Sequence, residues 1–207
     1  MSVWDCLDVP LVWDVSRTVL NLSIGLYRER FRLMRRWGLI DGTSSFIDVG
    51  CGIGQYSGVT AGEYLGIDLN DRYIRRARLK CGRPKATFRT ADAKTLAEEG
   101  SRFDAVLMVD VLHHLSDDQA VRLLRTAATI ARRHVICFDP VIEQTNPLGR
   151  WLVRNDRGDF VRSEARILAL FSGVGLPAAR QQRLQMGPIT TLALLAHPRP
   201  LAHSVAA

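Results

Sequence analysis

The chain has 207 residues, 47% of them hydrophobic, which is enough to bury the core of one domain but short for two. Its formal net charge of +7 permits a polyanionic partner without requiring one. No apolar run reaches the ~18 residues that cross a bilayer and no signal-like segment opens the chain, so we expect a cytoplasmic protein without a membrane span.

Residues 1–42 are expected to form a helical segment ahead of the main body of the domain. The pattern predicts one or two amphipathic helices that end by Gly38. The apolar positions on one face are Leu20, Ile24, Tyr27, Phe31 and Met34. This face either packs on a sheet or forms a lid over a ligand, and both interpretations stay open here.

A glycine-rich loop follows in the stretch FIDVGCGIGQYS, residues 46–57. The apolar run Phe46–Val49 predicts a strand, and the three glycines after it let the backbone turn and approach a ligand closely. The dinucleotide fingerprint fails in both registers, because Gln55 and Ser57 stand where it needs glycine or alanine. A phosphate-binding P-loop fails as well, since no Lys-Ser or Lys-Thr pair follows.

What fits is an acid-x-Gly-x-Gly-x-Gly pattern that starts at Asp48. The pattern resembles motif I of the class I S-adenosylmethionine-dependent methyltransferases, and the resemblance implies that S-adenosylmethionine is the cofactor. The residues that would bind it here are Asp48, Gly50, Cys51, Gly52 and Gly54. A tight turn that binds no ligand is the alternative. Only nine residues, 55–63, separate the loop from the next strand, so the helix between them must be short or irregular.

Three later strand ends extend the resemblance. Asp68 ends the strand in EYLGIDLN, where the family's acid holds both ribose hydroxyls, although an aspartate there is also a common helix cap. Asp92 follows the strand in ATFRTADA, where the family places an acid near the adenine amino group. Leu69 and Ala93 stand beside these acids, and Val109, at the end of the strand 103–109, would offer its backbone to the cofactor's ammonium group.

Polar residues also follow the fourth and fifth strands. Asp110, His113 and His114 should enter the cleft beside Gly50, because parallel strands end at the same edge of a sheet. Imidazole suits general-base catalysis, and we favour His114 as the base over His113. Asp139, at the end of the strand in HVICFDP, either orients a histidine or is itself the base. The alternatives are that the histidines only cap the following helix or bond to the backbone, and that catalysis comes from proximity alone.

The rest of the chain supplies helices, a long connection and a closing hairpin. Ser116 and Gln119 form a capping box ahead of a helix whose apolar stripe runs to Ala131. Asn146 and Pro147 look like the start of a short helix, and another helix begins near Glu164. We expect residues 143–162 and the helix around Tyr27 to select the methyl acceptor, since a connection this long is usually functional.

The predicted fold is α/β: one Rossmann-like, doubly wound, mostly parallel seven-stranded sheet that an antiparallel hairpin closes. A single methyltransferase domain spans residues 1–207, with the cofactor-binding half at 43–140 and a substrate-side insertion, helix and hairpin at 141–207. Four scattered cysteines, without metal-ligand spacing or pairing, argue against a metal or a disulfide framework.

The expected reaction is transfer of a methyl group to oxygen or carbon of a small metabolite. The sequence VDVLHHL resembles metabolite-directed members of the family more than those that methylate base amines. Methylation of RNA or a ribosomal component is the first alternative, because arginines are frequent on the expected helices. They more often lie on solvent faces, and the arginines of the long connection are the ones that an anionic small substrate would use. A protein that binds the cofactor without transferring the methyl group is the second alternative. Oligomeric state is not predicted.

Overall fold

The protein is built on one mixed seven-stranded sheet in the order β3-β2-β1-β4-β5-β7-β6. The computed structural model describes residues 26–144, 146–154 and 158–198, so Leu20 and Ile24 of the expected first helix lie outside the described residues. The strands are β1 (Phe46–Val49), β2 (Tyr64–Asp68), β3 (Ala86–Thr90), β4 (Phe103–Val109), β5 (Ala131–Pro140), β6 (Ala178–Met186) and β7 (Ile189–Ala196). The first five are parallel, and β7 pairs antiparallel with both β5 and β6. This confirms the predicted fold class and its closing hairpin.

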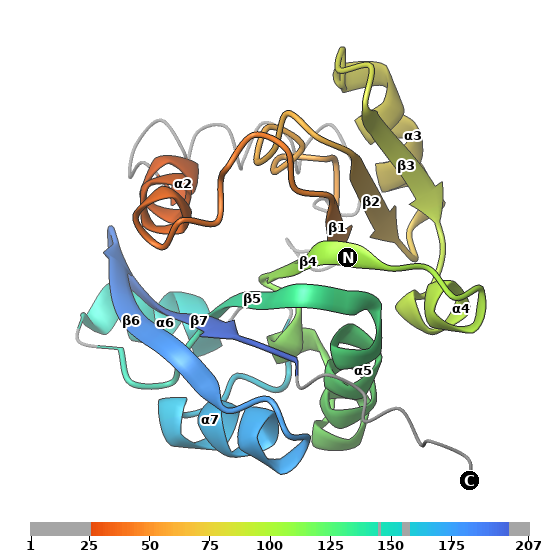
Figure 1. Ribbon diagram of the computed structural model, residues 1–207. Coiled ribbons are helices and arrows are strands. Elements are labelled where there is room, and N and C mark those ends of the chain that lie inside the picture. Colours follow the sequence, from red (N-terminus) through yellow and green to blue (C-terminus); the bar gives the residue numbers. More distant parts are fainter. Residues whose placement is uncertain (1–25, 145, 155–157, 199–207) are drawn as a thin grey trace, which may run out of the picture.

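Helices cover both faces of the sheet (Figure 1). They are α2 (Leu26–Arg36), α3 (Asp71–Lys80), α4 (Ala93–Glu98), the 3-10 helix η2 (Leu112–His114), α5 (Asp117–Ile130), α6 (Pro147–Arg154) and α7 (Glu164–Gly173). One apolar core joins the sheet to α4, α5 and α7, and a second joins it to α2 and α3. Every residue of β1 is buried, as expected for a parallel strand between two helical layers.

The helix starts follow local sequence signals. Ser116 and Gln119 form the predicted capping box of α5, and the Asn146 side chain accepts a hydrogen bond of 2.8 Å from the backbone N–H of Leu148 in α6. Ser163 caps α7, which begins at Glu164 as expected. These caps fix where each connecting segment stops and therefore which residues reach the carboxyl ends of the strands.

Two local expectations need correction. The segment between β1 and β2 forms turns where a short or irregular helix was expected. It is held there by Arg83, whose guanidinium donates to the backbone carbonyls of Ser57 and Thr60. Ala131 was expected on the apolar stripe of α5, but it is the first residue of β5, because α5 ends at Ile130 and the chain becomes extended.

Candidate active site

The glycine loop bends by placing its glycines in the left-handed region, and two of them are also packed tightly. Gly50 has φ +72°, and a Cβ there would lie 2.7 Å from Cγ2 of Val111. Gly54 has φ +81°, and a Cβ there would lie 2.7 Å from Cε1 of Phe88. Gly50 therefore keeps the cleft side of the loop bare, while Gly54 lets the loop sit on the Phe88 ring.

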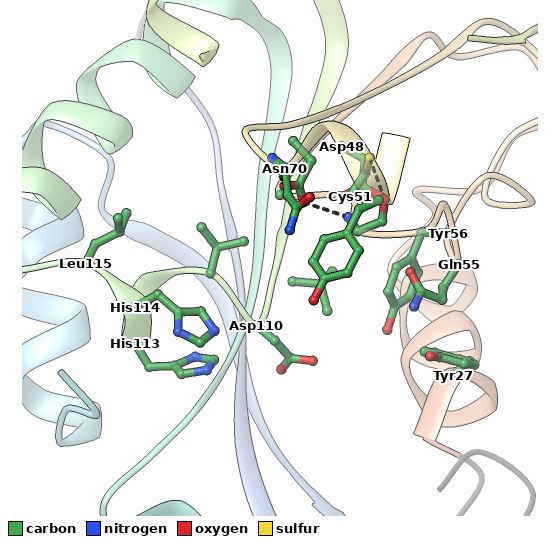
Figure 2. A pocket seen from close by; sticks show the side chains of 16 residues that line it. Tyr27, Asp48, Cys51, Gln55, Tyr56, Asn70, Asp110, His113, His114 and Leu115 are labelled. Carbon is green, nitrogen blue, oxygen red and sulfur yellow. Dashed lines mark hydrogen bonds between the residues drawn. The ribbon is translucent and has the colours of Figure 1, made fainter. Parts of the chain in front are cut away.

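Two adjoining cavities lie over the carboxyl ends of the parallel strands. The first has a volume of about 450 Å³ and the second about 420 Å³. They share Gly50, Asp68, Val111 and Leu115, so the glycine loop and the end of β2 form the border between them. The first cavity is also lined by Tyr27, Asp48, Cys51, Gly52, Gln55, Tyr56, Asn70, Tyr73, Val109, Asp110, His113 and His114. Figure 2 shows this cavity, with the labelled His113 and His114 across from Tyr27 and Tyr56.

Asp68 is fixed at this border by the backbone on both sides. One carboxylate oxygen accepts a hydrogen bond of 3.0 Å from the N–H of Gly52, and the other accepts one of 2.8 Å from the N–H of Asn70. Burial raises the pKa of Asp68, while these N–H groups and nearby His114 act in the opposite direction. The carboxylate thus has a defined orientation before any ligand binds.

Asp48 lies beneath the loop, in the wall of the first cavity. It is buried and accepts a 2.5 Å hydrogen bond from the Tyr64 hydroxyl. Burial raises the pKa of Asp48 to about 7, although the hydrogen bond from Tyr64 lowers it. Burial also raises the pKa of neighbouring Cys51, so this cysteine is a neutral thiol in the cavity wall.

A histidine–aspartate pair stands at the ends of β4 and β5. Nδ1 of His113 lies 3.0 Å from a carboxylate oxygen of Asp139, which also accepts a 3.1 Å hydrogen bond from the N–H of Leu112. Both side chains of the pair are buried, and burial raises the pKa of Asp139 while His113 lowers it. His114 is exposed, and its ring centroid lies 4.1 Å from that of His113. The aspartate predicted to orient a histidine therefore bonds to His113.

Sequence reasoning missed a buried ion pair on the other side of the cavity. Arg30 of α2 is 1% exposed and binds both carboxylate oxygens of Asp110, at 2.7 and 2.9 Å, and the Tyr56 hydroxyl at 3.0 Å. Burial opposes the charge of Arg30, but Asp110 and Tyr56 outweigh it and raise its pKa. Asp110 has φ +56°, an unfavourable conformation for a residue with a side chain. The interpretation of Arg30 as a solvent-face arginine is wrong, and its helical spacing from Tyr27 and Met34 was the available signal.

Arg162, one of the arginines expected to be available to an anionic substrate, is also buried. Its guanidinium donates to Asp117 at 2.7 Å and to the backbone carbonyls of Leu112, Phe160 and Leu115. These contacts occupy its nitrogen atoms within the protein. Arg157 of the same connection lies outside the described residues.

Comparison with known proteins assigns the central part of the chain. Residues 46–134 match the family model described as a methyltransferase domain. This part of the chain is similar to methyltransferase domains. The match covers β1 to the start of β5 and includes the glycine loop, Asp68 and both histidines, so it confirms the resemblance seen in the sequence.

Three individual proteins are similar to this part of the chain or to the whole fold. A stretch of 79 residues is 35% identical to the mitochondrial ubiquinone biosynthesis O-methyltransferase of Arabidopsis thaliana, covering 35% of this chain and 24% of that protein. The chain thus spans about a quarter of this curated relative. The structure resembles magnesium protoporphyrin IX methyltransferase from Synechocystis PCC 6803, solved with bound SAH, with a TM-score of 0.65, 22% identity, and 83% and 81% of the two chains covered. It also resembles the mitomycin 7-O-methyltransferase, with a TM-score of 0.61, 23% identity, and coverage of 75% and 49%.

The residues predicted to bind the cofactor divide into three groups in space. Asp48, Gly50, Cys51, Gly52, Asp68 and Val109 line the first cavity, and Leu69, Asp92 and Ala93 line the second. Gly54 is outside both linings and packs on Phe88. Across the part of the chain that is described, no helix has the length and apolar character of a membrane span. No cluster of potential metal ligands occurs among the same residues.

Proposed function

We propose that this protein is an S-adenosylmethionine-dependent methyltransferase that methylates an oxygen atom of a small, uncharged metabolite, with methylation at carbon as the variant of the same reaction. The observation that carries this proposal is the border formed by Gly50 and Asp68 between two cavities of similar volume. A nucleoside attached to an amino acid suits such a cleft. Its two ends can occupy the two cavities, the acid between them can bind the ribose hydroxyls, and the glycine backbone leaves room for the ligand.

The residues present fit the cofactor. Asp68 already has both carboxylate oxygens oriented by backbone N–H groups, so it can accept hydrogen bonds from both ribose hydroxyls. In the second cavity, Leu69 is 76% exposed and offers an apolar surface to the adenine, near Asp92 and Ala93. Val109 and the glycine loop offer main-chain groups to the amino-acid end in the first cavity.

The acceptor would occupy the remainder of the first cavity. Its described lining contains tyrosines, histidines, Gln55 and Asn70 but no lysine or arginine, and this disfavours a phosphate or carboxylate on the part of the acceptor that enters. Tyr27 and Tyr56, whose rings meet edge to face at 5.6 Å, suit an aromatic or otherwise flat molecule. The names of the ubiquinone and mitomycin relatives, both O-methyltransferases, support oxygen as the acceptor atom.

The histidine–aspartate pair supplies the base that a hydroxyl acceptor needs. With Nδ1 of His113 as the donor to Asp139, the lone pair of the neutral imidazole is on Nε2, and the ring lines the first cavity. Nε2 of His113 takes the hydroxyl proton of the acceptor as its oxygen attacks, and Asp139 stabilises the imidazolium that forms. S-adenosylmethionine, when bound, supplies a methyl carbon whose bond to sulfur breaks with both electrons going to sulfur. After the methylated product leaves, the imidazolium returns its proton to water that enters the emptied cavity.

The choice of His113 differs from the sequence-based preference for His114. His114 is exposed, and it influences the pKa of both Asp68 and Asp139. His113 is buried against Asp139 and lies beside Asp110 and His114 in Figure 2. Burial excludes water from the base, and a carboxylate fixes its orientation.

The test is transfer of a labelled methyl group. The protein is incubated with S-adenosylmethionine carrying a ¹³C-methyl group and either a metabolite extract or purified cellular RNA, and products are detected by mass spectrometry. We expect a small molecule to gain one labelled methyl group, RNA to gain none, and Asp68→Ala to give no product. Labelled RNA would contradict the proposed substrate class. Copurified S-adenosylhomocysteine with no labelled product would instead indicate a binding protein.

A further inference from the structure

The end of the long connection lies against the 3-10 helix that carries the histidines. The N–H of Phe160 donates a 3.0 Å hydrogen bond to the carbonyl of His113. Arg162 donates to the carbonyl of Leu112 at 2.7 Å and to that of Leu115. The backbone carbonyls of Leu112, His113 and Leu115 are therefore all bound by residues 158–162, which we call the buttress.

The buttress also touches the imidazole itself. Gly158 is buried, and a Cβ at this position would lie 2.1 Å from Cδ2 of His113 and 2.8 Å from its carbonyl oxygen. This separation is far below any real contact, so only glycine allows the chain to pass this close to the ring. The connection thus forms the back wall of His113, while Asp139 holds its Nδ1 atom.

The buttress is tied to the strand that carries Asp139. The N–H of Ile142, just beyond β5, donates a 2.9 Å hydrogen bond to the carbonyl of Arg162, and Val141 forms a parallel bridge with Arg162. Arg162 is anchored further by a 2.7 Å bond to Asp117 at the start of α5. The position of the buttress relative to Asp139 is consequently set by neighbouring residues of one chain segment.

The geometry points to Gly158 and Arg162 as positioning residues that hold the His113 ring in the orientation in which Asp139 fixes its tautomer. This inference rests on the proposed role of His113 and changes the role expected for the connection, which would act on the base in addition to any contact with the acceptor. Neither residue touches the acceptor or the cofactor. Their effect on the reaction passes through the orientation of the imidazole.

The experiment uses one conservative substitution at each position with a matched control. Gly158→Ala inserts a methyl group against the ring, and its control is Gly173→Ala, since an added Cβ at Gly173 meets nothing within 4 Å. Arg162→Lys keeps the charge but loses the forked hydrogen bonds, and its control is Arg125→Lys, at an exposed position of α5 outside both cavity linings. Two independent variants keep the test decisive if one of them does not fold.

Two readouts are taken at one pH. Two-bond ¹⁵N NMR of histidine-labelled protein reports the tautomer of His113, assigned with His113→Gln, and labelled methyl transfer gives kcat and KM. We expect Gly158→Ala and Arg162→Lys to change the His113 signal pattern and to lower kcat about 10-fold or more, with KM for the cofactor unchanged and both controls like the wild type. A wild-type His113 pattern in both variants would overturn the inference. If the wild type transfers no methyl group, the proposed function fails, while the NMR readout still decides whether the buttress positions His113.

Discussion

At the residue scale, the cleft depends on side chains whose ordinary states the fold has altered. Asp48 is a buried acid whose pKa is raised, Asp110 is held in a left-handed conformation, and His113 is buried with Nδ1 3.0 Å from a carboxylate oxygen of Asp139. Perturbed groups of this kind concentrate at functional sites, because a fold keeps them only where the surrounding structure compensates for their cost.

Substitutions of the two histidines should affect the pH profile of methyl transfer differently. We predict that His113→Gln lowers kcat by about 10²-fold or more and removes the fall in activity at low pH, because the base is gone. His114→Gln should keep that low-pH limb and lose less activity. Steady-state kinetics with the identified acceptor decides between them, and the opposite ranking of the variants would return the role of base to His114.

Asp48 should make folding stability depend on pH. Its pKa rises from 3.8 to about 7 on folding, so the folded protein keeps a proton that the unfolded chain releases. The stability of the wild type should therefore decline as pH rises from about 4 to 7 and stay level above that. In Asp48→Asn this decline should be reduced, because asparagine does not titrate, while its amide oxygen can still accept the hydrogen bond from Tyr64.

Urea unfolding midpoints across that pH range test the prediction for Asp48. Asp92→Asn is the control, since Asp92 is a helix cap that asparagine replaces well. An identical pH dependence in wild type and Asp48→Asn would show that the Asp48 carboxyl does not hold a proton in the folded state.

At the scale of secondary-structure elements, α2 forms part of the wall of the first cavity and also contacts the sheet. Its residue Tyr27 lines the first cavity, and its residue Arg30 binds Asp110 just beyond β4. Of the two interpretations of this helix from sequence, packing on the sheet is seen directly, because Leu33 and Met34 are buried in the core with β4 and β5. The role of a lid stays a prediction, supported by Tyr27.

Removal of Arg30 should cost far more stability than removal of an exposed arginine two residues away in the same helix. We predict that Arg30→Met lowers the free energy of unfolding by about 3 to 5 kcal/mol, because the buried guanidinium that binds both Asp110 and the Tyr56 hydroxyl is lost. Arg32→Met, at a 56% exposed side chain paired with Glu29, should change it by less than about 1 kcal/mol. Urea denaturation measures both variants, and adding Asp110→Asn to Arg30→Met should restore part of the loss. Equal costs for the two arginines would refute this account of the ion pair.

Local signals predicted most elements, and long-range pairing explains what they missed. Apolar runs located the parallel strands, and the Ser116 and Asn146 caps located the helix starts, because these depend on neighbouring residues. The partners of Arg30 and Arg162 come from distant segments, so no local pattern identifies them, although the helical spacing of Arg30 could indicate that it lies on the buried face. Asp139 could be predicted to orient a histidine from its place at a strand end. Which histidine it contacts depends on long-range packing, so the choice of His113 needed the structure.

At the scale of the whole molecule, the parallel half of the sheet and its connections have separate tasks. The family match covers residues 46–134, which hold the glycine loop and Asp68, while Asp139 and the buttress lie beyond it. The part proposed to bind the cofactor therefore lies in the matched region, and the segments proposed to support the base and enclose the acceptor lie mainly outside it. The basic residues that give the chain its net charge of +7 do not line the first cavity, whose described lining has no lysine or arginine.

The claim on which the rest depends is that Asp68 and the glycine loop bind the nucleoside of S-adenosylmethionine. Isothermal titration calorimetry with S-adenosylhomocysteine tests it without any need for the acceptor. We predict one site per wild-type chain and a loss of about 1.5 to 3 kcal/mol in Asp68→Ala, roughly 10- to 100-fold in Kd, because two hydrogen bonds to a charged group disappear. Glu63→Ala, at an exposed position just before β2, should bind like the wild type. No binding to the wild type, or equal affinity in Asp68→Ala, would contradict the account.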